Sequence, residues 1–169
     1  MPFFNYTFRT LSTIYPSFTE NGKRYAFYTS FVDEQTDFSG LYLAPSILQK
    51  AIDVKTELRI TVVGNKVFAA SITGDSSFMG KHIRDWRVTS LIGEARYQAF
   101  DLPKKIADQC VALVRELGLQ FGAIDAIIDK HNKLWFLENN PNGQWAFIEE
   151  ETKLPIGKAI AHLLMRGSG

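Results

Sequence analysis

Asp125 and Glu138 are the residues whose types and spacing most clearly suggest chemistry. They fall in two segments rich in strand-forming residues, 121–129 and 134–139, which four polar residues separate. This pattern predicts a β-hairpin. If its turn is centred between residues 131 and 132, Asp125 lies opposite Glu138, and two facing carboxylates repel each other unless a cation lies between them.

Asn140 adds a third oxygen to this pair. Because side chains alternate along a strand, we expect Phe136, Glu138 and Asn140 on one face, with Asp125 opposite on the first strand. Two carboxylates and an uncharged amide oxygen suit a hard cation such as Mg²⁺. An alternative stays open, in which Glu138 and Asn140 only end a strand at the surface, but the facing position of Asp125 favours a metal site.

The elements that must position this hairpin form a mainly antiparallel α+β fold. Gly64-Asn65 predicts a tight turn between two strands rich in Val, Ile and Thr. The predicted strands cover residues 3–11, 24–32, 46–52, 57–63 and 66–72, with loops at 33–40 and 73–81 and helices at 103–117 and 155–164.

The helix at 103–117 has the clearest signal. Asp101 is expected to cap its start and Gly118 to end it. The residues of its apolar stripe recur at steps of four and three: Leu102, Ile106, Cys110, Leu113 and Leu117.

Composition limits the classes of function. The chain has 169 residues, 46% of them hydrophobic and 22% charged, with a net charge of +1. This favours one globular domain, assigned to residues 1–165, with 166–169 as a tag or tail and without nucleic-acid or membrane partners. The single cysteine excludes an intrachain disulfide and favours the cytoplasm.

Two further groups have ordinary interpretations. The charge run Glu149, Glu150 and Glu151 is expected to be solvated. Trp86 and Trp145 are expected either to pack in the core or to line a substrate channel.

With these residues in place, the chain resembles the ATP-grasp ligases. The resemblance rests on Asp125 and on Phe-Leu-Glu-Asn-Asn-Pro-Asn-Gly-Gln-Trp at 136–145. Residues 45–52 resemble the family's hinge strand, 57–64 resemble the strand after it, and Asp85-Trp86-Arg87 resembles its Asp-Trp-Arg element. The match runs from about residue 8 to 164 and is most similar to the microviridin and graspetide type, which matures ribosomally made peptides.

The resemblance implies a C-terminal lobe that binds ATP and Mg²⁺, an antiparallel sheet with helices packed on it. The metal ligands would be Asp125, Glu138 and Asn140, bridging the ATP phosphates. Glu57 would accept hydrogen bonds from the ribose. The adenine edge would be lined by Gln49, Lys50, Ala51 and Ile52.

Three arginines complete the implied site. Arg87 would contact the transferred phosphoryl group, because its planar fork matches phosphate oxygens. Arg59 lies in an apolar strand and is costly to bury unpaired, so it would pair with Glu57 or reach the phosphates or substrate. Two positions depart from the family pattern: Arg9 stands where a phosphate-binding lysine is expected, and Lys50 where the hinge usually has an acidic residue.

The resemblance implies a ligase that works through an acyl-phosphate. A precursor-peptide carboxylate, or another carboxylate substrate, would join a hydroxyl or an amine as an ester or amide. Two alternatives remain: an inactive ATP-grasp-like domain that binds nucleotide or peptide, and an amino-acid or glutamate ligase of the same superfamily. A homodimer is left open.

Overall fold

The computed structural model describes residues 6–10, 17–21, 23–26, 30–32, 36–39, 46–74, 77–78, 81–82 and 95–167. Contacts divide the chain into two compact units. The first comprises Met1–Ile52 and Gly74–Ala95, and the second comprises Asp53–Thr73 and Arg96–Gly169. A single domain over 1–165 stays a prediction.

The first unit contains three small antiparallel sheets within its described residues. β1 (Tyr6–Thr10) lies between β4 (Ser30–Val32) and β5 (Ser46–Lys50). The other two sheets are the pairs β2–β3 (Ser17–Glu20 and Lys23–Ala26) and β8–β9 (Ser77–Phe78 and Lys81–His82).

The strand predicted at 3–11 is confirmed as β1 in its described residues, and the strand predicted at 46–52 is confirmed as β5, which ends two residues earlier at Lys50. Two other predictions for this unit were partly wrong. The strand predicted at 24–32 contains parts of β3 and β4, which belong to different sheets. The loop predicted at 73–81 contains the short strand β8.

The second unit is a five-stranded antiparallel sheet with three helices, so the predicted α+β class is confirmed. The strand order is β10 (Arg96–Ala99), β7 (Lys66–Thr73), β6 (Val54–Val63), β11 (Phe121–Asp129) and β12 (Leu134–Asn140). The helices are α2 (Lys104–Glu116), α3 (Ala146–Thr152) and α4 (Ile156–Arg166). Two short elements were not predicted from the sequence: β10, which is four residues long, and α3, which is seven residues long.

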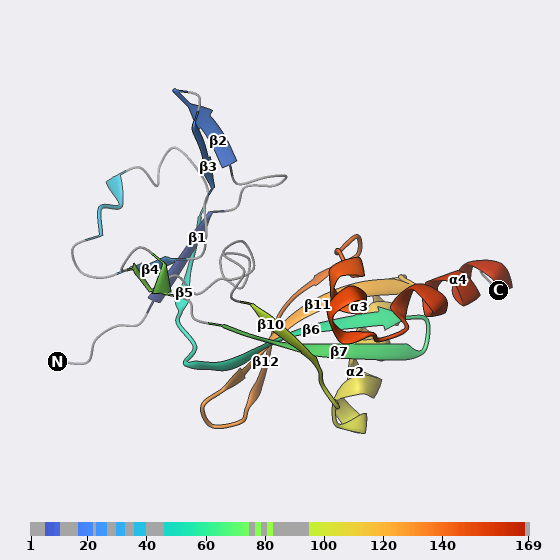
Figure 1. Cartoon of the computed structure of the whole chain (residues 1–169). Helices are drawn as coiled ribbons and strands as arrows, with labels where there is room; N and C mark the ends of the chain where they lie inside the picture. The colour runs from blue at the N-terminus through green and yellow to red at the C-terminus, as the bar shows by residue number, and fades with distance from the viewer. Residues whose placement is uncertain are drawn as a thin grey trace. The chain divides into compact units, whose positions relative to one another are not determined.

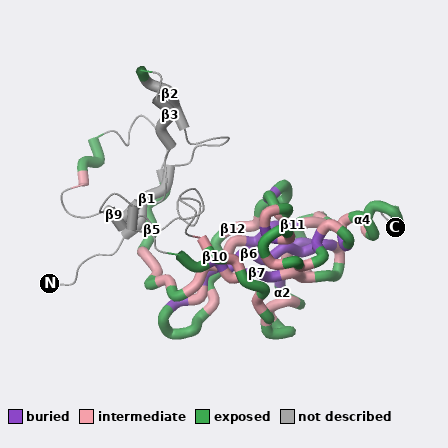
Figure 2. The backbone as a smooth tube through the Cα atoms, in the orientation of Figure 1, coloured by how far each residue is buried: buried purple, intermediate pink, exposed green. Residues whose placement is uncertain are grey.

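Each face of this sheet has its own core. Leu58, Ile60 and Ile124 pack with Cys110 and Val114 of α2 on one face. On the other face, Val63 and Ala70 pack with residues of α3 and α4. Figure 1 shows α2 on one side of the sheet and α3 and α4 on the other, and Figure 2 shows the buried backbone gathered in the central strands. The central strands β6 and β11 are therefore covered by packed side chains on both faces.

The helix α2 ends as predicted but begins differently. Gly118, at φ 70°, donates its N–H to the Arg115 carbonyl, and Leu119 donates to the Val114 carbonyl, an end that favours glycine. The expected cap by Asp101 is wrong, since the N-cap residue is Pro103 and no side chain caps the helix. Leu117 is also wrong as a core residue, because it is 54% exposed, whereas Val114 is buried.

None of the helices in the described ranges has the length and apolarity needed to cross a bilayer.

Candidate metal centre

Asp125 and Glu138 face each other in the ladder between β11 and β12, which confirms the predicted register. On its other side Asp125 pairs with Arg59 of β6. The three residues form one row across the sheet, which we call the charged row. Directly opposed residues of antiparallel strands have Cβ atoms about 4.5–5.5 Å apart, so the two carboxylates lie within reach of one cation.

The strand β12 does not keep a regular alternation. The register shifts between Asp125 and Ala126, so that Ala126 pairs with Phe136 while Asp125 pairs with Glu138. Leu137 is the extra residue of this bulge. The prediction that Phe136 shares a face with Glu138 is therefore wrong, because an inserted residue reverses the alternation beyond it.

Asn140 lies opposite Ala123 in the ladder. This pair is the next one on the same face of the sheet as the charged row. Its side-chain Oδ1 accepts a hydrogen bond from the Asn142 N–H at 2.9 Å. This contact fixes the orientation of the amide, and a carbonyl oxygen retains a second lone pair for a metal.

The chain turns back over the site at Gly143. Its N–H donates to the Asn140 carbonyl at 3.3 Å, and the residue is buried. A Cβ atom on Gly143 would lie 2.4 Å from Cβ of Ala123. Only glycine lets the turn pack this closely against the strand that carries Asp125.

Arg59 contacts one of the candidate metal ligands directly. Its Nη1 lies 3.0 Å from Oδ1 of Asp125, and the two side chains are 7% and 20% exposed. The partners predicted from the sequence were Glu57, the phosphates or the substrate, and Asp125 was not among them. The two residues become neighbours only because β6 pairs with β11, a long-range pairing that the spacing of the residues does not indicate.

The donors in these two rows fit magnesium in kind and number. No group of three or more His, Cys, Asp or Glu residues placed to hold a metal occurs in the described part of the chain. Mg²⁺ commonly binds through one or two carboxylates and completes its shell with water and phosphate oxygens. Asp125, Glu138 and Asn140 supply such a partial, oxygen-only set, whereas a fully enclosed metal cage would need more ligands.

Asp129, which sequence analysis did not single out, organises the β11–β12 turn. Its carboxylate accepts hydrogen bonds from the backbone N–H groups of His131 and Lys133 and from Trp135 Nε1, at 2.8, 2.9 and 2.8 Å. The bond from Trp135, with those from the backbone, lowers the pKa of Asp129 below its ordinary value. Asn132, at φ 62°, completes the turn. Asp129 therefore holds the hairpin whose ladder aligns the carboxylates.

The other predicted residues are distributed over both units. Glu57 lies on the same face as Arg59, two residues earlier in β6. Gln49 and Lys50 end β5 and are exposed, and Ala51 and Ile52 follow it partly buried and outside regular structure. Arg9, in β1, pairs with Ile47 of β5, and Arg87 falls outside the described residues.

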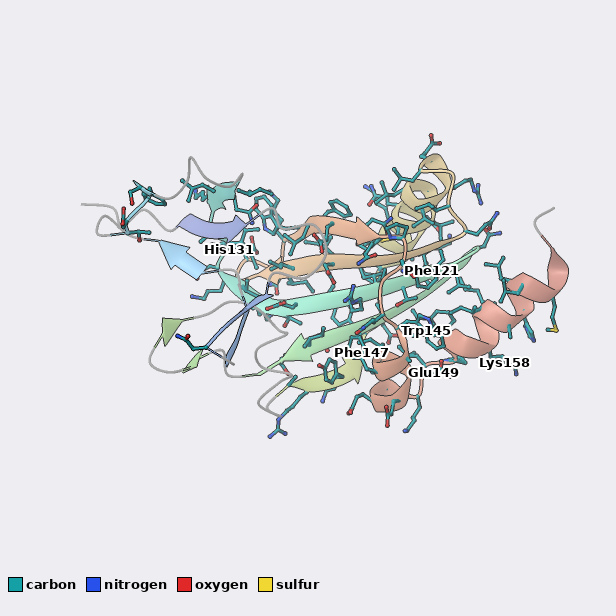
Figure 3. The ribbon with its side chains drawn as sticks, turned by 90° about the horizontal axis from the view of Figure 1, so that it is seen from above. Phe121, His131, Trp145, Phe147, Glu149 and Lys158 are labelled. Atoms are coloured by element: carbon teal, nitrogen blue, oxygen red, sulfur yellow. The ribbon has the colours of Figure 1, made fainter. Side chains whose placement is uncertain are left out.

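Glu149 is not the solvated residue that was expected. Its Oε2 accepts a hydrogen bond of 2.6 Å from the N–H of Gly157, in the first turn of α4. Trp145 packs in the adjacent core cluster, beside α3 (Figure 3). A carboxylate at a helix N-terminus satisfies an N–H group that has no partner within the helix. Glu149 therefore fixes α4 against α3, while Glu150 and Glu151 are exposed as predicted.

The second unit thus combines an α+β sheet with a row of facing carboxylates, the arrangement predicted for an ATP-grasp ligase. No protein-family model matches the chain, and no curated protein sequence matches it. Several solved structures, however, match the chain. The D-alanine–D-alanine ligase of Bacillus anthracis matches with a TM-score of 0.57 and 11% identity over 96% of this chain and 54% of its own, which shows the fold.

Two peptide-modifying enzymes match more closely. A RiPP-associated ATP-grasp ligase of Chryseobacterium gregarium, solved with ADP and a leader and core peptide, has a TM-score of 0.84 and 27% identity. The macrocyclase MdnC of Microcystis aeruginosa MRC, solved with the precursor peptide MdnA, has a TM-score of 0.79 and 31% identity. Each match covers 98% of this chain, which spans about half of their length, 49% and 50%. The predicted resemblance to RiPP-associated ATP-grasp ligases is confirmed.

Proposed function

We propose that this chain is the ATP- and magnesium-binding part of an ATP-grasp ligase that modifies a ribosomally made precursor peptide. The observation that carries the proposal is the charged row: Asp125 faces Glu138 in a fold whose similar structures include RiPP-associated ATP-grasp ligases. A cytoplasmic location is part of the proposal, since that compartment supplies ATP.

In this proposal Asp125, Glu138 and Asn140 hold Mg²⁺. The bound ion supplies positive charge that neutralises the phosphate oxygens during transfer. The ladder of β11 and β12 sets the spacing of the two carboxylates. The turn after Asn140 fixes the amide oxygen on the same face.

Roles for the nucleotide-binding residues come from the family resemblance. Gln49, Lys50, Ala51 and Ile52 line the adenine edge, and Glu57 accepts hydrogen bonds from the ribose. Arg9 and Arg87 bind phosphate oxygens, for which a guanidinium is well shaped. The change to Lys50 at the hinge does not remove the backbone N–H and carbonyl that pair with a base.

The reaction proceeds in two transfers. A carboxylate of the peptide attacks the γ-phosphorus of ATP, and the bond to the bridging oxygen breaks, which gives an acyl-phosphate and ADP. A hydroxyl or an amine then attacks the acyl carbon, loses its proton and expels phosphate. The product is a side-chain ester or amide, and no covalent bond to the protein is required.

Calorimetric titration of ATP with Mg²⁺ into the chain tests the nucleotide site. We expect binding that requires Mg²⁺ and is lost in Glu138→Ala. Glu150→Ala is the matched control, because Glu150 is an exposed glutamate of α3 and does not belong to the charged row. Equal binding by Glu138→Ala and the unmutated chain would refute the assignment of Glu138.

Product analysis tests the ligase reaction. Incubation with ATP and candidate precursor peptides should release ADP and give a peptide lighter by one water for each ring. A peptide that gains a separate amino acid instead would support the amino-acid ligase alternative. Nucleotide binding without ADP release from any peptide would support the inactive alternative.

A further inference from the structure

The charged row contains its own cation. Arg59 lies in β6, a central strand, and its guanidinium is 3.0 Å from the carboxylate of Asp125. The arginine side chain is only 7% exposed, so water screens this pair weakly. The ladder fixes the backbones of both residues on neighbouring strands.

The charges of the row have a direct consequence for metal binding. Arg59 contributes one positive charge, and Asp125 and Glu138 contribute two negative charges, so the row carries a net charge of about −1. A divalent cation that binds both carboxylates also approaches the guanidinium. The repulsion energy of two like charges a few ångströms apart is several-fold larger in a partly buried site than in water.

A polyphosphate changes this balance. Its oxygens bring negative charges that offset the guanidinium, and they complete the coordination shell that Asp125, Glu138 and Asn140 leave open. Arg59 can then face phosphate and carboxylate together, because it has five N–H donors in a planar fork.

We propose that Arg59 is an internal counter-ion that disfavours the bare divalent cation and makes metal loading depend on the nucleotide phosphates. Without nucleotide, Arg59 takes the place of the metal beside Asp125 and keeps the facing carboxylates compatible with the fold. This inference rests on the proposed function, since it concerns the same metal site.

Mn²⁺ binding to Arg59→Gln and Arg59→Lys, measured by equilibrium dialysis without nucleotide, tests the proposal. Glutamine removes the charge but retains a donor for Asp125, whereas lysine retains the charge. We expect the unmutated chain and Arg59→Lys to bind bare Mn²⁺ weakly and Arg59→Gln to bind it roughly tenfold more tightly or better. Equal or weaker binding by Arg59→Gln would overturn the proposal.

The unmutated chain provides a second test that does not depend on the folding of a variant. Mn²⁺ complexed with inorganic tripolyphosphate should be retained by the chain under conditions in which bare Mn²⁺ is not. Retention of bare Mn²⁺ with the same affinity would show that Arg59 does not impose the dependence on phosphate.

Glu138→Ala separates this inference from the proposed function. If metal–nucleotide binding is lost in Glu138→Ala but bare Mn²⁺ binds equally to all Arg59 variants, the metal site stands and the counter-ion role fails. If Glu138→Ala has no effect on metal–nucleotide binding, the metal site itself is wrong.

Discussion

Replacing Gly143 by alanine should disturb both the fold and the candidate metal centre. The new Cβ atom would lie 2.4 Å from Cβ of Ala123 and 3.3 Å from Cβ of Asn140. Carbon atoms in favourable contact are about 3.5–4.0 Å apart, so one chain segment must move by about 1.1–1.6 Å. Ala123 is fully buried in β11 between two neighbouring strands, so the turn that follows Asn140 is the part that moves.

Overpacking of this kind typically costs about 1–3 kcal/mol, and we expect Gly143→Ala to lower the free energy of unfolding by about 2 kcal/mol. Ala123→Gly alone should cost about 1 kcal/mol, because glycine weakens a strand interior. The double variant lacks the close Cβ pair, so its loss should be smaller than the sum of the single losses. The expected coupling is about 1–2 kcal/mol, in the range found for residues in contact.

Urea denaturation followed by circular dichroism gives the free energy of unfolding of the four proteins, and calorimetry gives their Mg²⁺–ATP affinity. Gly143→Ala should bind the metal–nucleotide more weakly, and Ala123→Gly in the same chain should restore part of the affinity. Strictly additive losses of stability would refute the reasoning, because they would show that the two positions do not collide.

Three further predictions concern residues that hold the site in place. Asp129→Asn should lower the free energy of unfolding at neutral pH, because the pKa of Asp129 is lowered in the folded state. The ionised carboxylate stabilises the fold fully above the ordinary pKa of 3.8, and this stabilisation is lost as the pH falls through the lower pKa of the folded state. Acid titration of Trp135 fluorescence should show this transition in the unmutated chain and a reduced one in the variant. Glu149→Ala should lower the free energy of unfolding by about 1–2 kcal/mol and Glu149→Gln by less, as measured in urea, since glutamine still accepts a hydrogen bond at the helix terminus. Gly122→Ala would place a Cβ atom 2.4 Å from Oδ1 of Asn139. We expect this variant to lose about 1–3 kcal/mol of the free energy of unfolding, and Asn139→Ala in the same chain to restore part of that loss. An unchanged midpoint of urea denaturation in Gly122→Ala would contradict this packing.

The sequence predicted the parts of the fold that local rules determine. The hairpin at Gly64 follows from a residue that adopts φ 58° without strain, and it is present between β6 and β7. Asp125 and Glu138 are opposed as predicted, although the strand pairs next to the β11–β12 turn are centred on His131 and the bulge at Leu137 then brings Glu138 opposite Asp125. The approximate positions of turns and strands are local properties, so one sequence was sufficient to predict that these two strands form a hairpin.

Other features depend on contacts between distant segments. Neither the neighbour of Arg59 nor the partner of Glu149 could be read from spacing, because Asp125 lies across a strand pairing and Gly157 lies on another helix. The bulge at Leu137 was also missed, since an inserted residue has no reliable signal in an apolar strand.

These long-range contacts explain how the candidate site can be both acidic and well packed. Facing carboxylates on neighbouring strands would destabilise a two-stranded ladder, yet β11 lies within a sheet covered on both faces. Arg59 supplies the compensating charge from the third strand, and Gly143 closes the turn over Ala123 in the adjacent row. The core around β6 and β11 therefore supports a repulsive pair of carboxylates in a fixed geometry, as the proposed metal–nucleotide site would require.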